Sequence, residues 1–423
     1  MVSSFHGLEL GKRGLSVGQA SISTTGQNIA NVNTKGYSRQ QVNSSASPSL
    51  DVWTSQGANT GQLGTGVNLD SITRVRDFFL DQQFRDHSET LGQWQAKQTT
   101  LDRLETIVNE PSDSGLNTAM DGLKNAWQDL ANEPDSLSAQ AVVKERAQGF
   151  IEVAQSMNKS MDNLNSELLQ QSQQTVEEAN AYLKQIADLN KSIVRDGNQS
   201  NDLKDKRDAL VEELSTLMSI KVDEKSNGSY SISLASNNQP LVSGEEVSEI
   251  DDKAGAEGNK VYGGKLAGLS ESMDIAKDYQ ANLNKVVADF ASANSMSATG
   301  GKDQALFIGN AAEFKLSELK VNYAADPLKQ PAGTGKTSEA AQSDFRKLVS
   351  QLGAQSQAAV NSVSNHGAAL QATENRRQSV TGVSLDEEMA NLIKYQHSYN
   401  AAARLVSMTD QMLDTIINRM AAR

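Results

Sequence analysis

The chain has 423 residues, a formal net charge of −13 and no cysteine. It is too long for one ordinary domain and long enough for two or three. The acidic balance argues against nucleic acid and membrane surfaces as partners, because both recruit clustered Lys and Arg side chains. The lack of cysteine excludes disulfides, thiol chemistry and cysteine-ligated metals. No segment approaches eighteen consecutive apolar residues, and no secretory signal precedes Lys12 and Arg13.

Residues 4–33 are predicted to form a helix with an apolar stripe on one side. The stripe consists of Phe5, Leu8, Leu15, Ile22 and Ile29. From Leu8 onward its members fall seven residues apart, which is the spacing of a coiled-coil seam. The same segment carries five glycines, and each weakens a free helix by roughly 0.5–1 kcal/mol relative to alanine. This composition suits a helix that other backbones approach closely, and we expect it to become ordered when neighbours bury it.

The next segment is predicted to stop this helix and to continue without regular helical structure. Asn33 and Gly36 tolerate left-handed backbone, so residues 31–36 should end the helix. Residues 37–73 are expected to be irregular or extended, with one short strand around residues 67–72.

Amphipathic patterns over residues 74–110, 116–132, 137–196 and 201–218 predict a helical bundle. The third pattern alone would give a helix about 90 Å long, at 1.5 Å per residue, which fits an elongated molecule. Further helices are expected over residues 265–295 and 344–380.

Two stretches depart from the helical pattern. Over residues 220–234 apolar residues alternate with polar ones, and Asn227-Gly228 is typical of a hairpin turn. Residues 220–263 therefore predict a small β-rich insertion. Residues 298–340 are expected to be loop-rich, with short strands near 306–308 and 319–323.

The C-terminal segment, residues 385–423, carries the longest uninterrupted heptad pattern. Its apolar positions are Leu385, Met389, Leu392, Tyr399, Val406, Leu413, Ile417 and Met420. We predict a coiled-coil seam whose partner is the N-terminal helix. The sequence leaves open whether the two helices pair within one chain or between chains.

Patterns that suggest enzymes lack the required context. The segment Gly14–Gly18 matches the nucleophile motif G-x-S-x-G, but it lies inside a predicted helix instead of a strand–turn–helix. Residues 333–337 resemble a phosphate loop, but Gln330 replaces the required earlier glycine, so a flexible loop is predicted.

The four histidines lack the spacing of a metal-binding pair. The charged residues 202–208 are interpreted as a solvated helix face with i,i+4 pairs. We predict no enzymatic activity, no cofactor and no metal site.

Four blocks of residues resemble the flagellar rod, hook and hook-associated proteins. The first block carries the signature residues Asn31, Thr34, Gly36 and Tyr37. The others lie within residues 64–85, 202–215 and 382–413, so the resemblance spans most of the chain. Within the family, these blocks are most similar to the members that join hook and filament.

The resemblance implies a structural subunit of the bacterial flagellum that is exported by the flagellar type III apparatus without a cleaved signal. It would be extracellular after a transient cytoplasmic stage. Its partners would be copies of itself in a ring, the hook protein, the next junction protein and a cytosolic chaperone on the C-terminal helix. The alternatives are another axial subunit, such as flagellin or a cap, and a secreted coiled-coil tether or adhesin.

The expected fold is mainly α, elongated, and contains a small β part. Residues 1–36 and 382–423 would form a terminal coiled coil, which the resemblance places at an axial core. Residues 37–219 and 264–381 would form an elongated helical bundle. Residues 220–263 would form a small β-rich outer domain, which is modest in size for the family.

Overall fold

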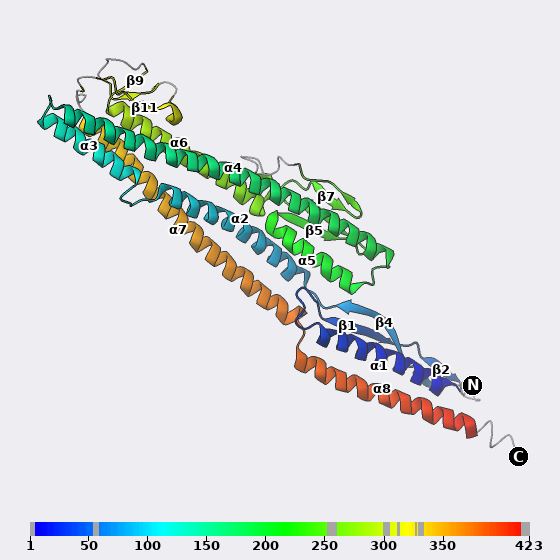
Figure 1. The fold of residues 1–423 in the computed structure, drawn as a ribbon. Coiled ribbons are helices and arrows are strands. Elements are labelled where there is room, and N and C mark those ends of the chain that lie inside the picture. Colours follow the sequence, from blue (N-terminus) through cyan, green and yellow to red (C-terminus); the bar gives the residue numbers. More distant parts are fainter. Residues whose placement is uncertain are drawn as a thin grey trace.

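The computed structural model describes residues 5–53, 59–251, 260–298, 305–310, 314–325, 328 and 334–415. The molecule is long and narrow, and helices from both ends of the chain lie together at one end of it (Figure 1). Small sheets lie beside the helices. The prediction of an elongated, mainly α fold with a small β part is confirmed.

A bundle of long helices makes up most of the molecule. Its helices are α2 (Phe78–Val108), α3 (Leu116–Asn132), α4 (Leu137–Arg195), α5 (Asn201–Leu217), α6 (Gly264–Ala293) and α7 (Thr334–Thr381). The start of α2 is fixed by Asp77, whose carboxylate accepts the backbone N–H of Phe79 at 2.9 Å. Its end is fixed by Asn109, which adopts φ 46°.

The start of α7 differs from the prediction. Residues 334–337 were expected to be a flexible loop, but they form the first turn of this helix. The helix extends toward α3 because Ala341 and Phe345 are buried in the core and Gln342 donates to Asp121 at 2.8 Å. Residue 333 lies outside the described part of the chain.

Two hydrophobic clusters hold the bundle together. The larger one joins α2, α3, α6, α7 and the first half of α4, and contains the Phe150–Phe290 pair with ring centroids 4.7 Å apart. Trp127 on α3 is fully buried in it. The smaller cluster joins the second half of α4 and α5 to a sheet through side chains such as Leu183 and Ile232.

That sheet is the predicted β-rich insertion. Its strands are β5 (Ile220–Glu224), β6 (Tyr230–Leu234), β7 (Pro240–Ser243) and β8 (Glu246–Val247), paired in that order. The hairpin between β5 and β6 turns at Gly228, which adopts φ 82°. The sheet shares its core with α4 and α5, so it packs on the bundle instead of standing apart.

A smaller sheet lies at the opposite end of the molecule from the terminal helices (Figure 1). It contains β9 (Met296–Ser297), β10 (Phe307–Ile308) and β11 (Lys320–Val321). Single-turn helices η2 (Lys260–Tyr262) and η3 (Leu316–Glu318) complete the described connections.

The remaining elements form a unit that we call the terminal arm. It consists of α1 (His6–Ala30), α8 (Leu385–Asp414), β1 (Gln40–Ala46), β2 (Leu50–Trp53), β3 (Asn59–Leu63) and β4 (Val67–Arg74). The strands pair antiparallel as β1 with β4 and β2 with β3. Strands β1 and β4 lie along α1 (Figure 1). Arg13 of α1 donates to Asn68 of β4 at 3.2 Å. The segment predicted to be irregular or extended is thus two β ladders. Partners in β1 and β4 lie more than 20 residues apart, so no local pattern shows their pairing, whereas β2 and β3 form a hairpin that the prediction missed.

Candidate assembly interface

Helices α1 and α8 pack antiparallel through the glycines of α1. Gly7 faces Thr409, Gly11 faces Val406, and Gly18 faces Tyr399. A Cβ atom placed on Gly11 would lie 2.6 Å from Val406 Cγ2, which is closer than real contacts allow. The glycines therefore permit the close approach that their number in the sequence predicted. The pairing occurs within one chain, so α8 of the same chain buries part of the surface of α1.

The apolar stripe of α1 is not the face that meets α8 most closely. Leu8, Leu15, Ile22 and Ile29 lie next to the glycine face, about 30–90° around the helix from it at 100° per residue, and remain half-buried. This corrects the expectation that leucine and isoleucine would form the centre of the seam. Small residues occupy the centre because the two backbones are too close for larger ones.

Several apolar side chains of the arm are exposed. On α8 and just before α1 they are Phe5, Leu385, Met389, Ile393, Met408 and Met412, and on β4 they are Leu69 and Ile72. The predicted positions Leu392, Tyr399, Val406 and Leu413 are half-buried. Ile417 and Met420 lie outside the described residues. Sequence reasoning missed Ile393, Met408 and Met412 because they fall between the heptad positions.

The described part of the arm helices has no buried large apolar side chain. The buried residues there are Gly11, Gly18, Ser21, Thr24, Thr25, Asn28, Glu388 and Thr409. Among the described residues, the hydrophobic clusters belong to the bundle and to the two sheets that pack on it, β5–β8 and β9–β11. An apolar surface that its own chain leaves uncovered is typical of a protein–protein contact.

The glycine seam gives a testable prediction. Gly11→Leu should separate α1 from α8, because its side chain would overlap Val406. Hydrogen exchange in both arm helices should then accelerate while the thermal transition of the bundle stays unchanged. Gly26→Leu is the matched control, since no atom lies within 4 Å of its Cβ position. Equal exchange in the two variants would contradict the close-approach argument.

The signature residues form the turn that ends α1. Thr34 Oγ1 donates to Asn31 Oδ1 at 3.1 Å, and Gly36 adopts φ 80°. The Tyr37 hydroxyl donates to Asn28 Oδ1 at 2.9 Å. Burial of Tyr37, together with the nearby carboxylates, raises the pKa of its hydroxyl, which keeps it protonated as the donor. The turn thereby directs the chain from α1 into β1.

Next to this turn a buried carboxylate holds the start of α8. Glu388 is only 2% exposed and accepts Arg39 Nε at 2.8 Å and Asn28 Nδ2 at 3.1 Å. The backbone N–H of Arg39 donates to the Thr381 carbonyl at 3.0 Å. These bonds connect the first turn of α8 and the last turn of α7 to α1 and to Arg39, the residue before β1.

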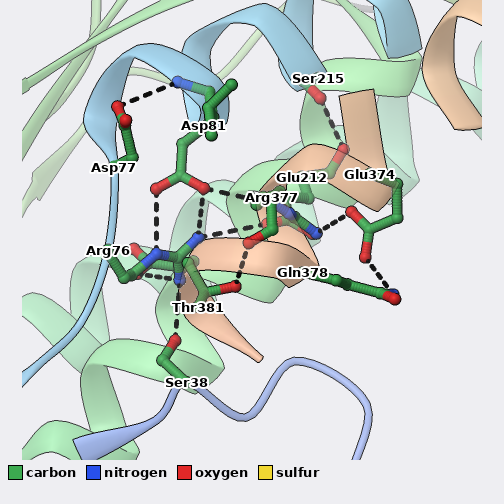
Figure 2. A network of polar contacts seen from close by, with 12 residues as sticks. Ser38, Arg76, Asp77, Asp81, Glu212, Ser215, Glu374, Arg377, Gln378 and Thr381 are labelled. Atoms are coloured by element: carbon green, nitrogen blue, oxygen red, sulfur yellow. Dashed lines mark hydrogen bonds and ion pairs between the residues drawn. The ribbon is translucent and has the colours of Figure 1, made fainter. Parts of the chain in front are cut away.

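A cluster of charged side chains connects the arm to the bundle. We call it the joint cluster; its members are Arg74, Arg76, Asp81, Asp205, Asp208, Glu212 and Arg377. Arg76 makes two bonds to Asp81, at 2.8 and 2.9 Å, and one to Asp208 at 2.8 Å. Figure 2 shows Arg76 and Arg377 lying together between Asp81 and Glu212. Arg377 also stacks over the ring of Phe84, 4.1 Å from its centroid.

The joint cluster corrects the interpretation of residues 202–208. They were expected to form a solvated helix face, but Asp205, Arg207 and Asp208 are buried. Asp205 accepts Arg74 Nη1 at 2.7 Å and the backbone N–H of Ser38 at 3.0 Å. The cationic partners lie more than a hundred residues away in sequence, so no local spacing could reveal them.

Asp208 makes the joint cluster sensitive to pH. Burial alone would raise the pKa of its carboxyl, but Arg76 and Arg74 outweigh burial and lower it below the ordinary 3.8. A lowered native pKa contributes stability that is complete above pH 3.8 and is lost as pH falls through the native value. Burial raises the pKa of the neighbouring Glu212, with the opposite effect on stability.

We therefore expect Asp208→Asn to cost about 2 kcal/mol at neutral pH. The difference from the natural chain should shrink as pH falls below 3.8, because the natural chain loses this contribution and the variant never had it. Glu212 is present in both proteins, so its effect largely cancels. Urea unfolding over a pH series measures the difference, and a gap that widens in acid would contradict the assignment.

A cavity of about 920 Å³ opens beside the joint cluster, and we call it the joint groove. One wall is the signature turn from Asn31 to Arg39. The other walls come from α2, α5, α7 and the connection to α8. The signature residues thus line a groove as well as ending a helix.

Within the described residues, no cluster of His, Asp or Glu could hold a metal ion, and no helix is long and apolar enough to cross a membrane.

Comparison with known proteins gives consistent matches. Residues 101–306 match the family model described as the flagellar hook-associated protein FlgK helical domain, and residues 376–420 match the flagellar basal body rod FlgEFG protein C-terminal model. The chain is 32% identical to flagellar hook-associated protein 1 of Bacillus subtilis over 502 aligned positions, covering 99% of both proteins. That alignment is longer than the chain, so the relative carries segments that have no counterpart here.

Other relatives match part of the chain. Flagellar hook-associated protein 1 of Salmonella typhimurium is 26% identical over 243 residues, which cover 56% of this chain and 42% of the relative. The solved structure of the flagellar hook junction protein FlgK from Burkholderia pseudomallei has a TM-score of 0.44 and 26% identity, covering 53% of this chain and 47% of the other.

Proposed function

The chain belongs to the flagellar hook-associated protein 1 family, and from this premise we propose that it is the adapter that joins the hook to the filament. It is a structural component of the bacterial flagellum, and its family is a structural one. The secreted tether or adhesin considered as an alternative lacks such support.

One observation carries the proposal beyond family membership: the terminal arm leaves apolar side chains uncovered. Exposed Met389 and Ile393 follow one flank of α8, and the described arm helices contain no buried large apolar residue. Burying such a surface against a neighbouring subunit is favourable, at roughly 25 cal/mol per Å² of apolar area. The seam residues given above are the proposed contact surface between copies.

In this proposal the copies form a ring between the hook protein and the next junction protein. Export occurs through the flagellar type III apparatus without a cleaved signal, and a cytosolic chaperone covers α8 until then. The proposed regions are a terminal arm, a helical bundle and a small β part at residues 220–263. Residues 40–74 are assigned to the arm because β1 and β4 pack along α1.

Deletion of the gene in the source bacterium tests the proposed function. We expect hooks without filaments, filament protein shed into the medium, and loss of swimming. Supplying this chain should restore all three. Filaments that remain attached to hooks in the deletion strain would refute the adapter role.

A further inference from the structure

Two neighbouring aromatic side chains at the start of α2 are largely exposed to solvent. Phe79 is 69% exposed and Phe78 is 56% exposed. The backbone beneath them is fixed, because Asp77 accepts the N–H of Phe79. The guanidinium of Arg85 lies 5.7 Å from the Phe78 ring centroid. The pair therefore forms a preformed projection on the bundle, directly beside the arm.

The joint groove lies on the other side of the same helix turns. Phe84 and Ser88 of α2 line it. At about 100° per residue, Phe79 points about 140° away from Phe84 and 180° away from Ser88. Phe79 and the groove therefore lie on opposite sides of α2, whereas Phe78 lies about 120° from Phe84 and about 80° from Ser88.

The groove has the chemistry to receive an aromatic ring. Its half-buried apolar lining includes Val32, Phe84, Ala209, Leu370 and Val383. Its cations already contact rings, as Arg377 does above Phe84. Lys35 stands at the lip with its side chain 96% exposed and pairs with Glu213 at 3.5 Å. The other carboxylates of the lining are likewise paired, as Glu374 is with Arg377 at 2.8 Å. Apolar walls with nearby cations favour an aromatic side chain, since a ring gains both burial and cation–π attraction.

We propose that Phe79 of one copy, with Phe78 beside it, docks into the joint groove of the next copy. This inference rests on the proposed function and adds a second lateral contact, continuous with the one made by the arm. A projection on one side that fits a groove on the other is a heterologous contact, which closes into a ring or extends into a helix. The signature turn thereby forms one wall of the acceptor.

Cross-linking tests this contact, because the chain contains no cysteine. The test variant carries Phe78→Cys, which keeps the docking ring of Phe79, and Lys35→Cys. Flagella isolated from a strain that makes only this variant are treated with a short bismaleimide. We expect loss of the monomer band and a ladder of multiples. The control pairs Lys35→Cys with Leu137→Cys at the start of α4, where the natural side chain is 75% exposed against 56% for Phe78. The control should remain monomeric.

The outcomes separate the two proposals. A test variant that is present in flagella but stays monomeric, or a control that forms the same ladder, would overturn the docking contact alone. Absence of the natural chain from flagella would overturn both.

A second measurement tests the contact even if the double variant is not incorporated into flagella. Phe79→Ser should lose incorporation at an unchanged melting temperature, whereas Phe79→Trp should keep it. Normal incorporation of Phe79→Ser would overturn the contact.

Discussion

Replacing Arg76 with methionine is expected to lower the free energy of unfolding by about 3–5 kcal/mol. The guanidinium is 16% exposed and makes three short bonds, to both oxygens of Asp81 and to Asp208. Methionine can fill part of the space, but it leaves buried carboxylates without their counter-charge. The loss in free energy of unfolding should be smaller in acid, because protonation neutralises the carboxylates that lack a counter-charge.

Arg103→Met is the matched control for this prediction. Arg103 also pairs with a carboxylate, that of Glu167, but both side chains are more than 40% exposed. An exposed pair contributes less than about 1 kcal/mol. Urea unfolding followed by circular dichroism compares the two variants at pH 7. A loss in Arg76→Met no greater than that in Arg103→Met would show that the joint cluster does not stabilise the connection between arm and bundle.

Ile393→Asp is expected to abolish assembly while leaving the isolated chain intact. Ile393 is 54% exposed on α8, so an aspartate there remains solvated in the monomer and changes stability by less than about 0.5 kcal/mol. In the assembled ring the same carboxylate would be buried without a partner, at a cost of several kcal/mol in every copy. Swimming in soft agar and immunoblots of isolated flagella measure the effect.

Ser398→Asp controls for the added charge, because Ser398 is an exposed polar residue about 140° from Ile393 around the helix. We expect this variant to swim and to be incorporated. Equal loss in both variants would mean that acidity anywhere on α8 blocks assembly. Normal incorporation of Ile393→Asp would remove this flank from the contact surface.

Most of the length of each helix could be predicted from the sequence. The segment Leu116–Asn132 was predicted with the bounds that it has, and α4 was predicted within one residue. Helical periodicity, together with Pro and Gly at the turns, is a local signal, so it can be recognised without knowledge of the tertiary structure. The heptad spacing of the two ends and the signature residues likewise pointed to paired terminal helices and to the family.

What the sequence could not decide is which surfaces meet. Heptad spacing suggested Leu8 and Leu15 for the centre of the seam, whereas the glycines of α1 form it. Residues 202–208 had the spacing of a solvated face, yet Asp205 and Asp208 meet arginines more than 130 positions away. Periodicity marks the face of an element that packs, but it does not identify the distant element that packs against it. The sequence determined the helices and the family, and the tertiary structure decided the glycine seam, the buried joint and the groove beside it.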